Sequence, residues 1–107
     1  MVPVTKKKIS KMAIGKMLGN KRSEILELAR NHGAREIRVF GSVARGEADD
    51  RSDVDFLVSM EPGRSLFDMG GLLVDLENLL GRPVDVVTEK GLRDRIRERI
   101  LREAVPL

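Results

Sequence analysis

Apolar residues recur at helical spacing in three segments of the chain. These segments predict helices over residues 23–32, 65–80 and 92–104. Ser23 is the expected N-terminal cap of the first helix, and Ser65 opens a capping-box-like sequence at the start of the second. The apolar positions are, helix by helix, Ile25, Leu28 and Ala29; Leu66, Met69, Leu73, Leu76 and Leu80; and Leu92, Ile96, Ile100 and Ala104.

Short alternating or valine-rich runs between these helices predict three strands. Residues 35–40 alternate charged and apolar side chains, so Ile37 and Val39 should face the same side of a sheet. Residues 53–58 and 82–88 predict the second and third strands. The helix between these two is long enough for a crossover, so we expect them to be parallel. The order of elements predicts an α/β (α+β) fold with a small mixed sheet flanked by helices.

Charge divides the 107-residue chain into two parts. Residues 1–22 carry seven basic side chains and no acidic one, whereas residues 23–107 carry 13 basic and 17 acidic side chains. We therefore expect a basic, solvated and partly disordered extension over residues 1–20 and a single domain over residues 21–107. A basic arm could touch RNA, but the aromatic residues are only three Phe, so stacking surfaces for nucleic acid are scarce. Nucleic acid is therefore a possible but not a favoured partner.

Composition excludes several other classes of site. The chain has no cysteine, which removes disulfides, thiolate zinc sites and cysteine nucleophiles together. No stretch approaches the roughly 20 apolar residues that span a bilayer. Lysines interrupt every apolar run near the start, so a signal peptide is not expected. These features predict a cytoplasmic protein without a membrane partner.

Three aspartates lie in the two later strands, where acidic residues are uncommon. Asp53 and Asp55 open one strand and face the same way, and Asp85 interrupts the other. Neighbouring strands would bring the three together, and clustered carboxylates repel one another unless a cation binds. Oxygen ligands favour Mg²⁺ or Mn²⁺, and two such ions can stabilise the attacking and leaving oxygens of an in-line displacement. Asp85 could also accept a proton from an attacking hydroxyl. The alternative is that each Asp is hydrogen-bonded to loop amides at a sheet edge.

A glycine–serine pair, Gly41 and Ser42, follows the first predicted strand. Glycine allows a sharp turn and a close ligand, and Ser42 with the following amides offers donors to phosphate oxygens. The alternative interpretation is that Ser42 is an ordinary helix cap. Arg45 could reach a phosphate from the same loop, or it could form an ion pair with Glu47 or Asp49.

The remaining charged residues are predicted to have structural roles. His32 lies at the end of a predicted helix, where we expect it to contact terminal carbonyls. The last helix interleaves arginines with Asp94, Glu98 and Glu103, a pattern that predicts ion pairs along its surface.

The order of these motifs resembles a known family. GSVARGEADDRSDVD resembles the signature of the DNA polymerase β-like nucleotidyltransferase superfamily, in which a Gly-Ser pair is followed after ten residues by Asp-x-Asp. FGSVARGEADDRSDVDFLV followed by LLGRPVDVVT more closely resembles the minimal nucleotidyltransferases, the MNT antitoxins of HEPN/MNT toxin–antitoxin pairs. The resemblance covers residues 21–107 and implies the nucleotidyltransferase fold.

The resemblance also implies a site and a reaction. By position, Gly41 and Ser42 bind the triphosphate, Asp53 and Asp55 bind magnesium ions, and Asp85 is the third catalytic carboxylate. Members of the family attach AMP from ATP to a tyrosine hydroxyl of a HEPN toxin, which is an RNase. The hypothesis is therefore Mg²⁺-dependent transfer of AMP from ATP to a cognate HEPN toxin. Two alternatives stay open: an antitoxin that acts by direct binding without catalysis, and nucleotidyl transfer to RNA or a small molecule.

Overall fold

A mixed four-stranded sheet organises the described part of the chain. The computed structural model describes residues 15–49 and 51–107, of which residues 15–20 are helical. The strands have the order β3-β2-β1-β4; β1 is antiparallel to β2 and β4, and β2 is parallel to β3. The predicted mixed sheet and the predicted parallel pair are confirmed. The elements are α2 (Arg22–Asn31), β1 (Ala34–Phe40), α3 (Gly41–Ala44), β2 (Val54–Met60), α4 (Leu66–Leu80), β3 (Val84–Thr88), the 3₁₀ turn η1 (Glu89–Gly91), α5 (Asp94–Glu103) and β4 (Val105–Pro106).

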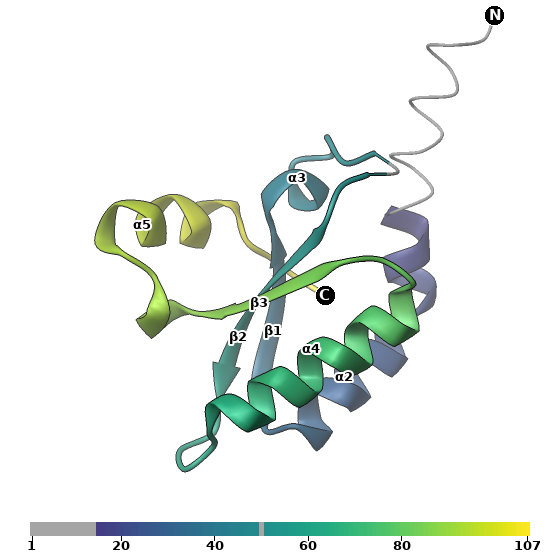
Figure 1. The fold of residues 1–107 in the computed structure, drawn as a ribbon. Helices are drawn as coiled ribbons and strands as arrows, with labels where there is room; N and C mark the ends of the chain where they lie inside the picture. Colours follow the sequence, from purple (N-terminus) through teal and green to yellow (C-terminus); the bar gives the residue numbers. More distant parts are fainter. Residues whose placement is uncertain (1–14, 50) are drawn as a thin grey trace, which may run out of the picture.

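The two faces of the sheet are covered unequally (Figure 1). Helices α2 and α4 pack on one face and bury the main core, to which Val54, Phe56 and Val58 of β2 contribute. Helix α5 lies on the other face over a smaller apolar cluster that contains Phe40, Leu57 and Ile100. Side chains alternate along a strand, so the residues between the β2 core positions point to this thinly covered face. Asp55, between Val54 and Phe56, therefore points to this face and stays partly accessible.

Helix α4 begins and ends where its sequence predicts. The backbone N–H of Ser65 donates to Asp68 at 2.8 Å, and the Ser65 hydroxyl accepts from the N–H of Phe67 at 3.1 Å, which completes the capping box. These contacts satisfy N–H groups that have no partner inside the helix. Gly81 ends the helix with φ +67°, a backbone conformation that suits glycine.

The start of α2 differs from the prediction. Ser23 is not its cap, because α2 begins at Arg22 and follows the helical residues 15–20 after a turn at Lys21. The N–H of Lys21 donates to the carbonyl of Met17 at 3.0 Å and its carbonyl accepts from the N–H of Ile25 at 2.9 Å, so Lys21 joins the two helical segments, and α2 has no side-chain cap. Within that earlier helix Leu18 is buried in the main core. The rest of the predicted basic extension, residues 1–14, lies outside the described residues.

Strand β4 was not predicted from the sequence. Its two residues pair with the middle of β1, Val105 with Val39 and Pro106 with Arg38. A pair of residues is too short to produce a recognisable alternation. Among the described residues, no helix is both long enough and apolar enough to cross a bilayer.

Candidate active site

The predicted site residues meet at the end of the sheet where β1 finishes and β2 and β3 begin. This end is called the acidic edge below. Strand β1 ends at Phe40, which pairs with Asp55 near the start of β2, and Asp55 in turn pairs with Asp85 near the start of β3. Paired residues on adjacent strands project to the same face, so Asp55 and Asp85 lie side by side. Gly41 follows β1 directly, and α3 begins at this edge (Figure 1). The predicted proximity of the glycine–serine pair to the acidic strands is therefore present.

The aspartates form a cluster in which negative charge is poorly compensated. Asp55 is half-buried, whereas Asp53 and Asp85 are exposed. Burial, followed by the negative charges of Asp85 and Asp53, raises the pKa of Asp55 to about 6. Between the described residues, none of these three carboxylates accepts a hydrogen bond, so the alternative in which loop amides satisfy each Asp gains no support.

This cluster fits a divalent cation by residue type and position. Its donors are all carboxylate oxygens, the ligands that Mg²⁺ and Mn²⁺ prefer. As the side chains stand, no three acidic or histidine residues of the described chain are gathered closely enough to hold a metal ion. Like charges repel one another when nothing offsets them, and this repulsion adds to burial in raising the pKa of Asp55. A cation would remove this repulsion and draw Asp53, Asp55 and Asp85 inward.

The loop that leads into Asp53 is held by the segment before β3. The Arg82 guanidinium donates to the backbone carbonyl of Ser52 at 3.1 Å and to that of Asp49 at 3.4 Å. The N–H of Val54 donates to the carbonyl of Pro83 at 3.1 Å, which joins the starts of β2 and β3. These contacts fix the backbone on both sides of Asp53 although its side chain is free to reach a ligand.

Gly41 occupies a position that only glycine fits without strain. Its φ is +75°, in the left-handed region that side-chain-bearing residues rarely adopt. A Cβ atom at this position would also collide with the Asp55 carboxylate. The absence of a side chain therefore lets the β1–α3 turn lie directly against the acidic cluster.

Glu103, which the sequence did not assign to the site, completes this edge. The N–H of Gly41 donates to Glu103 Oε2 at 2.9 Å, and Arg45 donates through Nη1 to Glu103 Oε1 at 2.6 Å. The prediction that Glu103 forms an ion pair along its own helix was wrong, because the last turn of α5 directs it to the β1–α3 turn. That prediction holds for Asp94, which pairs with Arg97 at 3.3 Å.

Arg45 is bound by two acids rather than left open. It pairs with Glu47 at 2.7 Å, one of the two partners considered from the sequence, as well as with Glu103. The hydrogen bonds that Arg45 donates, first to Glu47 and then to Glu103, raise the pKa of Arg45, and the bond that Glu103 accepts from Arg45 is the main cause that lowers the pKa of Glu103. Its contact with a phosphate stays a prediction.

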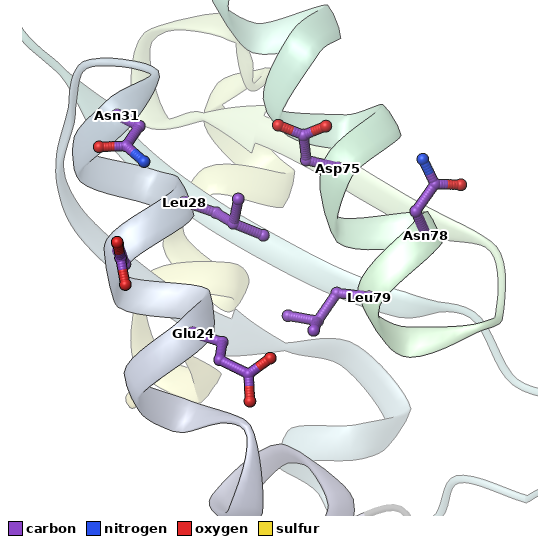
Figure 2. A pocket seen from close by; sticks show the side chains of 7 residues that line it. Glu24, Leu28, Asn31, Asp75, Asn78 and Leu79 are labelled. Carbon is purple, nitrogen blue, oxygen red and sulfur yellow. The ribbon is translucent and has the colours of Figure 1, made fainter.

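A groove away from the aspartates has the wrong chemistry for a nucleotide. A groove of about 510 Å³ lies between α2 and α4, and Figure 2 shows Leu28 and Leu79 pointing into it from the two helices. Its rim carries the carboxylates of Glu24, Glu27 and Asp75, which would repel a triphosphate. The groove also lies on the face of the sheet opposite Asp55.

His32, near this groove, has a different partner from the one expected. Its Nε2 lies 2.7 Å from Asp75 Oδ2, so the imidazole joins α2 to α4. The predicted contact with terminal carbonyls is made by the backbone N–H of His32, which donates to Leu28 at 3.1 Å and Ala29 at 3.2 Å, and not by its side chain. The ring also lies against Gly71, where a Cβ atom would come within 2.8 Å of His32 Cε1.

The raised pKa of Asp55, caused first by burial and then by its acidic neighbours, predicts a pH-dependent stability. In the unfolded chain its pKa is near the ordinary 3.8, and in the fold it is about 6. The folded state therefore keeps a proton that the unfolded chain has lost between these values, so stability falls as pH rises through this range. Asp55→Asn should raise the free energy of unfolding above about pH 7 by about 1–2 kcal/mol, after allowance for solvent screening.

Urea unfolding in the presence of a chelator measures this effect. The gain from Asp55→Asn should shrink as pH falls and vanish below about pH 3, where the wild-type carboxyl is protonated in both states. Glu98→Gln, an exposed charge removal on α5, is the matched control and should show no such trend. If the free energy of unfolding increases equally at every pH for Asp55→Asn, the ionisation of Asp55 is not the cause of the increase.

Comparison with known protein families assigns this fold. A family model described as the nucleotidyltransferase domain matches residues 22–107. The chain therefore belongs to the nucleotidyltransferase domain family. It is an enzyme of the transferase class.

The chain is similar to known proteins over most of its length. A solved structure described as a minimal nucleotidyltransferase is 53% identical, with a TM-score of 0.80 over 87% of this chain and 95% of that chain. Protein adenylyltransferase MntA of Thermococcus cleftensis is 48% identical over 79 residues, 74% of this chain and 80% of the relative. A toxin–antitoxin structure with AMP-PNP shares the fold at 21% identity, with a TM-score of 0.68 over 78% of this chain and 69% of that chain.

Proposed function

We propose that the chain transfers AMP from ATP to a hydroxyl group of a toxin protein, with Mg²⁺ as the metal. The observation that carries the proposal is the meeting of Gly41 and Ser42 with Asp55 and Asp85 at one open edge of the sheet. The similarity to a protein named as an adenylyltransferase supports AMP as the transferred group. The toxin–antitoxin structures that share the fold support a toxin as the acceptor, which we take to be of the HEPN type.

Each residue has a distinct task in this proposal. Gly41 and Ser42 contact the triphosphate from the β1–α3 turn, which lies against Asp55 because Gly41 has no Cβ. Asp53, Asp55 and Asp85 would hold the metal ions. Bound there, two divalent ions neutralise phosphate charge and stabilise the attacking and leaving oxygens. Arg45 would add a further cationic contact to the phosphates once it is released from its acidic partners.

The chemical step moves the AMP group from the pyrophosphate oxygen of ATP to the acceptor oxygen. The acceptor oxygen, proposed to be that of a tyrosine, forms a bond to the α-phosphorus. The bond from this phosphorus to the oxygen that bridges to the β-phosphorus breaks, and pyrophosphate leaves. Asp85 accepts the hydroxyl proton, for which its exposed position at the outer strand β3 is suitable.

Label transfer from ATP tests this proposal. The chain is incubated with Mg²⁺, the cognate toxin and ATP labelled at either the α- or the γ-phosphorus. The α-label should appear on the toxin and the γ-label should not, because pyrophosphate carries the γ-phosphorus away. Replacing the modified tyrosine by Phe should remove the signal. Label on the toxin from γ-labelled ATP would contradict nucleotidyl transfer, and α-label on added RNA or a small molecule instead would identify a different acceptor.

Neutralisation by contact alone is a second candidate, favoured by an exposed apolar pair. Leu66 is 82% exposed and Phe67 is 92% exposed at the start of α4. They follow the carboxyl end of β2, whereas Asp53 and Asp55 lie at its amino end, so a partner held there need not touch the acidic edge. Exposed aromatic residues are common anchors of protein interfaces.

Toxin neutralisation in cells separates the two candidates. Asp53→Asn with Asp55→Asn should abolish protection if catalysis is needed. Leu66→Ser with Phe67→Ser should abolish it if contact suffices. Protection that survives the aspartate changes at matched expression would reject the catalytic proposal.

A further inference from the structure

Glu103 makes two contacts at the β1–α3 turn that bear on nucleotide binding. Glu103 is the last residue of α5, and its carboxylate reaches across to the β1–α3 turn. Each of its two oxygens accepts from a different donor of the site: Oε2 from the N–H of Gly41 at 2.9 Å and Oε1 from Arg45 at 2.6 Å. The Glu103 side chain is only 14% exposed, so it fills this position rather than covering it loosely.

These two donors are the ones that an anionic ligand would need. A backbone N–H has one hydrogen and cannot serve a carboxylate and a phosphate oxygen fully at once. Arg45 donates through Nε to Glu47 and through Nη1 to Glu103, so two carboxylates already offset its charge. A phosphate that enters beside Gly41 therefore has to displace the Glu103 carboxylate or accept weaker contacts.

Electrostatics adds to this competition. Glu103 is one of the negative charges that raise the pKa of Asp55, so it lies within range of the acidic cluster. A negative group at this place also repels an incoming triphosphate. Removing Glu103 from the turn would relieve both interactions at once.

We propose that Glu103 occupies the phosphate position of the β1–α3 turn in the free protein and that nucleotide binding requires its displacement. The contact of Glu103 with Gly41 and Arg45 is called the latch below. It rests on the proposed function, since it presumes that a triphosphate binds at Gly41. It couples the end of α5 to the site, so a partner that moves α5 would also change the affinity for nucleotide.

ATP affinity of Glu103 variants tests the latch. Binding is measured by calorimetry with Mg²⁺ and without the toxin, for the wild type, Glu103→Gln and Glu103→Ala. Both variants should bind ATP about tenfold more tightly, because a charge-assisted contact no longer competes. Glu98→Gln, which removes one exposed charge from the same helix, is the matched control and should match the wild type. Urea unfolding of each variant shows whether it is folded during the measurement.

The outcomes separate the latch from the proposed function. Tighter binding by both Glu103 variants supports the latch. Unchanged or weaker binding, with ATP still bound by the wild type, overturns the latch and leaves the proposed function standing; weaker binding would mean that Glu103 holds Gly41 and Arg45 in place for the nucleotide. If neither the wild type nor any folded variant binds ATP, both proposals fail.

Discussion

Replacing Asp53, Asp55 or Asp85 by Asn lowers the rate of nucleotidyl transfer by about 10³-fold or more. Each change removes one carboxylate of the proposed metal site while it keeps the size of the side chain. The charge stabilisation that metal ions supply is worth several kcal/mol, and about 4 kcal/mol corresponds to about 10³ in rate. The measurement is the initial rate of label transfer from ATP at saturating Mg²⁺. Because the three residues are proposed to hold the same ions, the double variant Asp53→Asn with Asp55→Asn should be little slower than the slower single variant.

The controls for this prediction address folding and charge. Asp55→Asn should be at least as stable as the wild type near neutral pH, since burial and neighbouring acids raise the pKa of Asp55 to about 6. A loss of rate in that variant therefore cannot come from unfolding. Asp94→Asn, whose side chain is 96% exposed on α5, removes the same charge away from the site and should keep the wild-type rate. Full activity in any of the three site variants would remove that residue from the proposed mechanism.

Gly41→Ala is expected to destabilise the fold by about 2–4 kcal/mol, from a left-handed backbone and an overpacked contact. The φ of +75° at Gly41 disfavours any residue with a Cβ, and this Cβ would meet the Asp55 carboxylate. The two effects act together, so the cost should exceed that of backbone strain alone. Chemical unfolding of the variant and the wild type measures the difference.

Gly46→Ala is the matched control for Gly41→Ala. Gly46 has φ +71°, close to that of Gly41, but a Cβ there would have no neighbour within 4 Å. It should therefore cost only about 1–2 kcal/mol. Adding Asp55→Ala to Gly41→Ala should recover the excess, because the colliding carboxylate is gone. Equal costs for the two glycine variants would show that Gly41 is not pressed against Asp55.

The placement of the aspartates could be predicted because it depends on local rules. Alternation along a strand puts Asp55 on the face opposite Val54 and Phe56, which are buried. The α4 crossover makes β2 and β3 parallel, and the register then pairs Asp55 with Asp85. Hydrophobic pattern, helix length and capping are all readable from the sequence, so the sheet edge follows from them. The catalytic roles of these residues stay predictions.

The contacts that could not be predicted join residues far apart in the chain. Glu103 binds Arg45 across 58 residues and Gly41 across 62, and His32 binds Asp75 across 43. The local pattern around Glu103, an acid among arginines on a helix, is equally typical of a surface ion pair. Which partner it takes depends on how α5 packs on Phe40 and Leu57, and that packing has no signature in neighbouring residues.

Anomalous diffraction from Mn²⁺, in crystals that also contain a non-hydrolysable ATP analogue, tests most directly whether the acidic edge gathers metal and nucleotide. We expect a manganese peak within about 2–2.5 Å of carboxylate oxygens of Asp53 and Asp55, with the triphosphate against Gly41 and Ser42. A nucleotide bound elsewhere, or at this edge without any metal peak beside these aspartates, would contradict the account.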